Sequence, residues 1–185
     1  RAVEVLLAGR GALLLAGRGL GKSRFLNGVA EQLGRDPSVK VLRYREPPGV
    51  ERSLPAILRR LARDLGVDVP DVESFDDVLG EFFSRDAATQ SVCILFDEVD
   101  QYATPADGEP LGRRLFNHLE SCRQECDGRL GVLAAGGLGA YHLRSANASP
   151  FTARAERLRL SPFTVDEIAQ LAEPFRLDGR EIGRA

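Results

Sequence analysis

The chain has 185 residues, of which 43% are hydrophobic and 28% charged, an ordinary composition for one globular domain with a well-buried core. Its net charge of −2 gives no bulk electrostatic case for binding nucleic acid or an anionic membrane, although it leaves room for a local basic patch. The sequence shows no signal peptide and no apolar span of about 18 residues, which predicts a cytoplasmic protein that does not enter a membrane.

Strands and helices are expected to alternate along the first half of the chain. After a short apolar helical pattern, residues 12–16 (ALLLA) form an unbroken apolar run, as in a strand buried on both faces. Residues 22–33 carry an apolar stripe at helical spacing, and residues 39–44 predict a second strand. Further helices are expected over residues 54–65 and 75–83.

The second half continues this alternation. Residues 91–96 (SVCILF) are the most strand-like segment, whereas residues 101–112 contain two prolines and two glycines and are expected to form a loop. A helix over residues 111–126 leads to strands at residues 130–135 and 156–160. These five strands predict an α/β fold, a three-layer sandwich around one mostly parallel sheet.

Two segments are expected in the domain organisation. Residues 1–162 form the core domain, and residues 163–185 form the start of a helical lid, with a capping box from Thr164 to Glu167 (TVDE) opening its first helix. Both ends of the sequence look cut from something larger. We therefore interpret the chain as one domain of a longer protein.

A glycine-rich segment, AGRGLGKS at residues 16–23, matches the phosphate-loop pattern G-x-x-x-x-G-K-[ST] except that Ala16 replaces the first glycine. Glycines let successive backbone N–H groups point at a phosphate, and the following helix adds its N-terminal dipole. Lys22 would approach the β- and γ-phosphates of ATP, and the Ser23 hydroxyl would bind Mg²⁺. An alanine at position 16 is tolerated where its φ is negative.

A strand before the loop and an amphipathic helix after it favour a nucleotide site over a plain glycine-rich turn. The expected nucleotide-binding residues are Gly17, Arg18, Gly19, Leu20, Gly21, Lys22, Ser23 and Arg24.

An acidic pair, Asp97 and Glu98, directly follows the strand predicted at residues 91–96. The end of a parallel strand would place Asp97 beside the phosphate loop, where it would hold Mg²⁺ together with Ser23. Glu98 is the candidate general base for the attacking water. The alternative, two charged residues that merely cap a strand, is weakened by the phosphate loop upstream. Asp100 is expected to cap a helix or to pair with an arginine rather than to bind metal.

Four segments together resemble a known family: AGRGLGKSRFL, ILFDEVDQY, LGVLAAGG and SPFTARAERLRLSPFTVDEI. They resemble AAA+-related P-loop ATPases of the ASCE type, in particular the archaeal-type ATPase group of the STAND class, with origin-recognition-type initiators more distant. The resemblance spans about residues 5–172. It implies ATP hydrolysis and a site that contains Lys22, Asp97 and Glu98.

The resemblance also bears on residues near the end of the core domain. Ser149-Pro150 and Arg154 match a segment in which the arginine contacts the γ-phosphate, as a sensor in its own chain or as a finger for a neighbouring subunit. The alternative is an arginine on a solvated face. The family carries a polar sensor after the fourth strand, where this chain has only alanine and glycine at residues 134–137. That departure implies slow hydrolysis, or a nucleotide that serves mainly as a switch.

Three functions fit these observations. The first is an ATP-dependent switch or assembly module that self-associates or binds a protein partner through flanking domains. The second is a nucleotide-binding scaffold that does not hydrolyse, which would not need Glu98. The third is a DNA-loading initiator, which would need a winged helix outside the chain. A GTPase is disfavoured because no Asn-Lys-x-Asp motif occurs, and a small-molecule kinase because the Asp-Glu pair favours water as the nucleophile.

Three cysteines show no paired spacing that would indicate a disulfide framework. Cys93 lies in an apolar run and is typical of a small buried residue. Cys122 and Cys126 share one face of a predicted helix, and a metal site there would need further ligands. We interpret all three as structural.

Overall fold

The computed structural model describes residues 1–45, 53–68, 74–102, 105–107, 109–137 and 150–160. The elements in chain order are α1 (Ala2–Leu7), β1 (Gly11–Leu15), α2 (Lys22–Leu33), β2 (Val39–Tyr44), α3 (Leu54–Leu65), α4 (Phe75–Arg85), β3 (Ser91–Phe96), the 3₁₀ helix η1 (Val99–Tyr102), β4 (Pro105–Asp107), β5 (Glu109–Pro110), α5 (Leu111–Glu125), β6 (Leu130–Gly136), α6 (Pro150–Arg154) and β7 (Glu156–Leu158).

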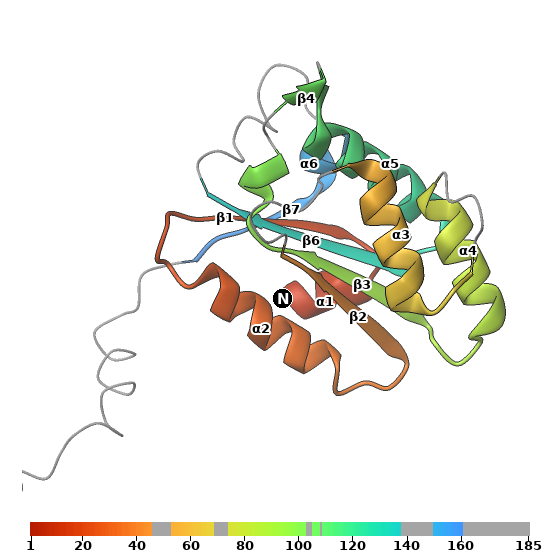
Figure 1. The fold of residues 1–185 in the computed structure, drawn as a ribbon. Helices are drawn as coiled ribbons and strands as arrows, with labels where there is room; N and C mark the ends of the chain where they lie inside the picture. Colours follow the sequence, from red (N-terminus) through yellow and green to blue (C-terminus); the bar gives the residue numbers. More distant parts are fainter. Residues whose placement is uncertain (46–52, 69–73, 103–104, 108, 138–149, 161–185) are drawn as a thin grey trace, which may run out of the picture.

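Five strands form one sheet in the order β2-β3-β6-β1-β7, and every neighbouring pair is parallel. Helices α1 and α2 cover one face, and α3, α4 and α5 cover the other (Figure 1). This arrangement confirms the predicted α/β sandwich. Parallel strands run in one direction, so the loops after β1, β3 and β6 all emerge at the same edge of the sheet.

Strand β3 illustrates why the sheet is buried on both faces. Its side chains alternate, with Val92, Ile94 and Phe96 in the apolar cluster under α3–α5 and Cys93 and Leu95 in the cluster under α1 and α2. Every residue of β3 after Ser91 is buried. Full burial of a large apolar side chain contributes roughly 1.5–3 kcal/mol, so this strand is strongly fixed in its register.

An aromatic cluster anchors the carboxyl end of β3. The ring of Phe96 stacks on Tyr44 of β2 with centroids 5.5 Å apart, and it meets Phe116 of α5 edge-on at 5.8 Å. Phe116 in turn stacks on Phe151 of α6 at 5.0 Å. Such ring pairs favour defined relative orientations. The backbone that follows Phe96 therefore starts from a rigid position.

The caps of α3 and α4 also follow from the sequence. The Ser53 hydroxyl accepts a hydrogen bond from the Ala56 N–H at the start of α3, which ends at Gly66 in the left-handed conformation. At the start of α4, Ser74 and Asp77 form a capping box in which each side chain accepts from the other residue's backbone N–H.

Two expectations differ from the structure. Residues 101–112 were expected to form a loop, but they contain the end of η1, the short antiparallel pair of β4 and β5, and the start of α5. Both strands of a two-stranded pair are edge strands, where proline is tolerated. The short helix α6 was not expected either, because five residues are too few to show helical periodicity. The lid expected at residues 163–185, with the capping box at Thr164, lies outside the described residues.

Within the described ranges, no helix combines the length and the apolar character needed to cross a membrane.

Candidate functional site

A cavity of about 760 Å³ lies where the loops after β1 and β3 emerge from the sheet. It is lined by Gly17, Arg18, Gly19, Gly21, Lys22, Ser23, Arg24, Asp97, Glu98, Asp100, Gln101 and Gly137. The expected phosphate loop and the expected acidic pair therefore face one space. Leu20 is the exception among the expected nucleotide-binding residues, since it does not line the cavity and is 53% exposed.

The backbone of the loop suits an anion. Gly19 and Gly21 have φ of +81° and +79°, a conformation that strains any other residue type. Gly21 is the N-cap of α2 and makes no side-chain cap hydrogen bond, so no capping side chain occupies the first N–H groups of this helix. Ala16 is not among the residues with positive φ, which meets the condition under which alanine is tolerated there.

The Lys22 ammonium is held inside the loop. Its Nζ donates to the carbonyl oxygens of Ala16, 2.9 Å away, and Gly17, 2.8 Å away. An ammonium group has three N–H donors. Two of them fix Lys22 to the loop, and the third is left for a ligand in the cavity.

Asp97 is 4% exposed and sits directly after β3. Its backbone N–H donates to the Tyr44 carbonyl oxygen at 2.8 Å, and its Oδ1 accepts from the Glu98 N–H at 2.9 Å. Its Oδ2 is buried and has no hydrogen-bond partner among the residues that the structure describes. Leaving a buried carboxylate oxygen unsatisfied is costly, and a cation satisfies it. Mg²⁺ prefers oxygen ligands, so Asp97 and Ser23, which both line the cavity, fit this ion.

Glu98 has φ of +55°, which is uncommon for a residue other than glycine. Its Oε1 accepts a hydrogen bond from Arg45 Nη2 at 2.8 Å, and its Oε2 accepts one from Gln101 Nε2 at 2.5 Å. Each carboxylate oxygen therefore accepts one hydrogen bond from this chain's own residues. A carboxylate has about four acceptor positions, so these contacts hold Glu98 in one orientation and leave positions for a water molecule.

Three residues of the site were not identified as such from the sequence. Arg45 and Gln101 hold Glu98, and Asp100 Oδ2 accepts a hydrogen bond from the Gly137 N–H at 2.6 Å. Asp100 thus places a carboxylate at the end of β6, where the sequence offers no polar side chain. The missing signal was the strand order: Tyr44 pairs with Phe96, which brings residue 45 beside the acidic pair.

Solved structures share this architecture over nearly the whole chain. The ORC1 protein of Aeropyrum pernix in complex with DNA matches with a TM-score of 0.63 and 20% identity, covering 93% of this chain and 46% of that one. The Walker-type ATPase of Pyrococcus abyssi matches with a TM-score of 0.63 and 17% identity, over 96% of this chain and 57% of that one. Cdc6p of Pyrobaculum aerophilum matches with a TM-score of 0.57 and 19% identity, over 88% and 42%.

The fold is that of the AAA+ P-loop ATPases. No protein-family model matches the sequence, and no curated protein matches it at a significant level. The chain spans about half the length of the solved AAA+ chains that it resembles.

Arg154 does not lie with the other candidate residues of the site. It ends α6, immediately before β7, so it belongs to the edge of the sheet opposite the phosphate loop. Its Nη1 lies 3.3 Å from Glu120 Oε1 of α5, and it is not among the residues that line the cavity. This position does not support a γ-phosphate contact within the same chain. A role toward a neighbouring subunit stays a prediction.

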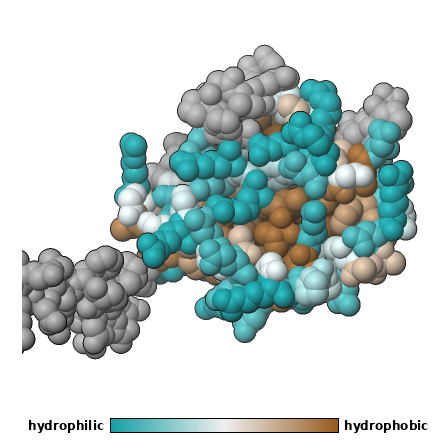
Figure 2. Space-filling model, turned by 60° about the horizontal axis from the view of Figure 1, so that its bottom comes forward, coloured by the Kyte–Doolittle hydropathy of each residue, from teal (hydrophilic) through white to brown (hydrophobic). Residues whose placement is uncertain are grey.

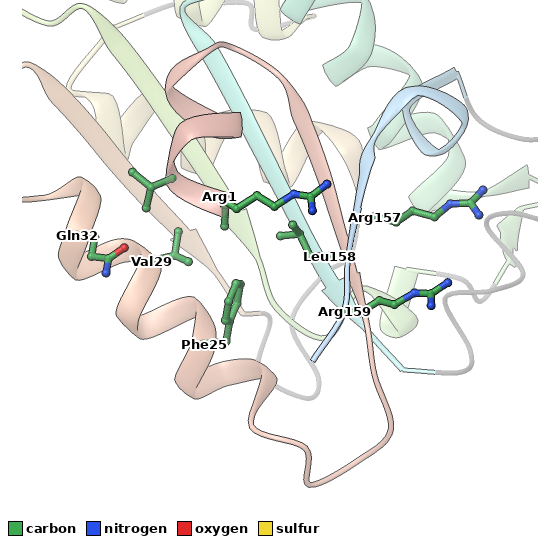
Figure 3. Close-up of a pocket in the computed structure, with 9 residues that line it drawn as sticks. Arg1, Phe25, Val29, Gln32, Arg157, Leu158 and Arg159 are labelled. Carbon is green, nitrogen blue, oxygen red and sulfur yellow. The ribbon is translucent and has the colours of Figure 1, made fainter. Parts of the chain in front are cut away.

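A second cavity, of about 430 Å³, lies between α1, α2 and β7. Phe25, Val29 and Leu158 project into it, whereas the side chains of Arg157 and Arg159 point away from α2 (Figure 3). This alternation is the normal pleat of a strand. From the side on which α2 lies, apolar residues gather in the middle of the face and polar residues surround them (Figure 2). This cavity shares no lining residue with the phosphate-loop cavity.

Proposed function

We propose that this chain binds ATP with Mg²⁺ in the phosphate-loop cavity and hydrolyses it slowly, as a nucleotide-dependent switch or assembly module of a larger protein. One observation supports this most directly: Lys22 and Asp97 line the same cavity. The Lys22 ammonium is hydrogen-bonded to the loop, and Asp97 Oδ2 is buried without a hydrogen-bond partner among the described residues. Together these groups match an anionic ligand that carries a divalent cation.

The roles of the residues follow from this arrangement. The N–H groups of the loop and of the start of α2 bind the β-phosphate, and Lys22 adds its positive charge. Ser23 and Asp97 hold Mg²⁺, which when bound neutralises charge on the phosphate oxygens. Glu98 orients a water molecule and accepts its proton, while Arg45 and Gln101 hold its carboxylate. We attribute slow hydrolysis to residues 134–137, which offer no polar sensor side chain after the fourth predicted strand.

Assembly is the second part of the proposal. The Arg154 side chain is 61% exposed although its guanidinium contacts Glu120. An exposed arginine at the edge of the sheet opposite the chain's own site is placed to contact a neighbouring subunit rather than its own nucleotide. Nucleotide-dependent self-association would use it as a γ-phosphate finger in that neighbour's site.

A DNA-loading initiator is the alternative that the solved structures favour. ORC1 of Aeropyrum pernix and the Drosophila ORC were both solved with DNA, and both match this chain in fold. The net charge of −2 argues against DNA binding by this domain alone. A DNA role would depend on domains outside the chain. A non-hydrolysing scaffold is a further alternative, and it makes Glu98 dispensable.

The chain provides a matched test because Lys22 and Lys40 are its only lysines. Lys40 is exposed on β2, outside the cavity. We expect Lys22→Ala to abolish binding of a fluorescent ATP analogue, and Lys40→Ala to retain it. Equilibrium titration by fluorescence anisotropy, with and without Mg²⁺, measures both. Full-strength binding by Lys22→Ala would remove the phosphate-loop assignment.

A further inference from the structure

A pair of thiols lies at the end of α5, on the far side of the sheet from the phosphate-loop cavity. Cys122 Sγ and Cys126 Sγ are 3.6 Å apart, close enough for one thiol to donate a hydrogen bond to the other sulfur. Cys122 is fully buried in the core beneath α5, whereas Cys126 follows the last helical residue and is only partly buried. The pair thus combines a partly buried cysteine with a fully buried one.

A metal site does not explain this pair. Asp76 of α4 interacts electrostatically with both thiols, but the described part of the chain holds no group of three or more His, Cys, Asp or Glu residues that could bind a metal ion. A closed tetrahedral site needs four such ligands. The pair has to be explained by the chemistry of the thiols themselves.

The surroundings favour a thiolate on Cys126. The hydrogen bond from the Cys122 thiol lowers the pKa of Cys126, and the positive charge of Arg129 acts in the same direction. Burial and the carboxylates of Asp76 and Glu125 oppose this shift without reversing it. The same hydrogen bond, together with burial, raises the pKa of Cys122. Cys126 is the less buried residue of the pair, and burial and hydrogen bonding both favour it as the nucleophile over the fully buried Cys122.

The backbone at this point can bring the sulfurs together. A disulfide needs its two Cβ atoms about 3.5–4.5 Å apart, whereas residues at i and i+4 of a helix have Cβ atoms about 5–6 Å apart. Cys126 lies just after the end of α5, and Asp127 and Gly128 beyond it have φ of +48° and +77°. The required shift involves this turn and the last hydrogen bond of the helix, in which the Cys126 N–H donates to the Cys122 carbonyl oxygen at 2.9 Å.

We propose that Cys126 is a site of oxidation by hydroperoxides and that Cys122 is its resolving partner, giving a reversible Cys122–Cys126 disulfide. The Cys126 thiolate attacks the terminal oxygen of the peroxide and the O–O bond breaks, which forms a sulfenic acid and releases hydroxide from hydrogen peroxide or an alkoxide from an organic hydroperoxide. Cys122 then attacks the Cys126 sulfur, an S–S bond replaces the S–O bond, and the sulfenic oxygen leaves as water with the thiol proton. The peroxide is reduced, and the two thiols are oxidised.

The cysteine pair and the phosphate loop lie at opposite edges of the sheet. The Arg129 N–H donates to the Cys126 carbonyl oxygen at 2.9 Å, and β6 starts at the next residue, Leu130. The disulfide would therefore form at the amino edge of the sheet, whereas the phosphate loop lies at the carboxyl edge. We expect the oxidised protein to bind ATP as the reduced protein does.

The test is peptide mapping of the wild-type protein after treatment with hydrogen peroxide. We expect a Cys122–Cys126 linked peptide that has lost two hydrogens and is restored by dithiothreitol. Cys93 is the internal control, because it is fully buried and burial raises its pKa to about 12. Cys93→Ser should give the same linked peptide as wild type.

Variants of the pair distinguish the two roles. Cys122→Ala, which keeps the core apolar, should leave Cys126 as a sulfenic acid that dimedone labels. Cys126→Ser should give neither a linked peptide nor a dimedone adduct on Cys122. The proposal is overturned if wild type gives only over-oxidised Cys126, a disulfide between two molecules, or no linked peptide at all.

Discussion

Glu98 is the residue on which hydrolysis depends. Its carboxylate lines the phosphate-loop cavity next to the Asp97 carboxylate, so its replacement should affect the reaction of water rather than the binding of phosphate. We expect Glu98→Gln to keep its affinity for ATP while turnover falls by roughly 10²–10⁴, the range for loss of a positioned general base. Phosphate release under saturating ATP measures this. Unchanged turnover would show that Glu98 is not the base.

Arg45 restrains that same carboxylate. Its guanidinium is 63% exposed and binds Glu98 Oε1 at 2.8 Å, so the pair contributes at most about 1 kcal/mol. Removing Arg45 takes away one of the contacts that hold Glu98, so its carboxylate can turn more freely toward a water molecule. We expect Arg45→Ala to raise turnover by up to about fivefold, with ATP affinity unchanged.

Arg43→Ala serves as the control, since Arg43 is exposed on the neighbouring stretch of β2 and does not line the phosphate-loop cavity. A fall in turnover would mean that Arg45 positions Glu98 instead of restraining it.

Helices α5 and α6 are joined by a buried carboxylate. Glu120 is 2% exposed and accepts hydrogen bonds from Arg123 Nε and Nη2 and from Arg154 Nη1. Arg123 Nη1 also donates to the Gly9 carbonyl oxygen at 2.7 Å, which ties α5 to the turn before β1. Because Arg123 is itself mostly buried and Arg154 is exposed, the two arginines should contribute unequally to stability.

We expect Arg123→Ala to destabilise the fold by about 3 kcal/mol, because it leaves a buried charge without its main partner. Arg154→Ala should cost less than about 1 kcal/mol. Urea unfolding curves for the two variants make the comparison, and equal losses would contradict it.

The contribution of Glu120 should also depend on pH. Burial alone would raise the pKa of Glu120, but the hydrogen bonds and charge of Arg123 outweigh it and lower the pKa below its usual value of 4.5. Because the folded-state pKa is the lower one, this stability is present above that value and is lost as the pH falls through the folded-state pKa.

Most elements could be predicted because their apolar periodicity is strong. Helix α2 and strands β2 and β3 begin and end at the residues expected from the sequence. The pair β4–β5 and helix α6 could not be predicted, since each is too short to show a period.

The functional site could likewise be predicted only where a local sequence pattern marks it. The phosphate loop and the acidic pair are local patterns, whereas the contacts Arg45–Glu98 and Asp100–Gly137 depend on strand order, which no local pattern records.

At the scale of the whole molecule, nucleotide binding should stabilise the fold. A ligand that binds only the native state at a concentration of about 100 times its Kd adds about 2.7 kcal/mol. For a chain of this length that corresponds to a rise in Tm of about 5–10 °C. We expect this shift with ATP and Mg²⁺ for the wild type and for Lys40→Ala, but not for Lys22→Ala. Differential scanning calorimetry measures it, and an equal shift in Lys22→Ala would place the nucleotide elsewhere.

The strand order also has a consequence for the protein as it is made. Strand β1 has β6 and β7 as its neighbours, so Gly11 pairs with Val132 and Ala12 with Glu156. At 5–20 residues per second, a ribosome needs on the order of ten seconds to synthesise the chain between β1 and these partners. During that interval β1 has neither of its neighbouring strands to pair with, and the phosphate-loop cavity is not complete. Chaperone contact during translation is therefore expected to concentrate on the ALLLA segment until β6 has left the exit tunnel.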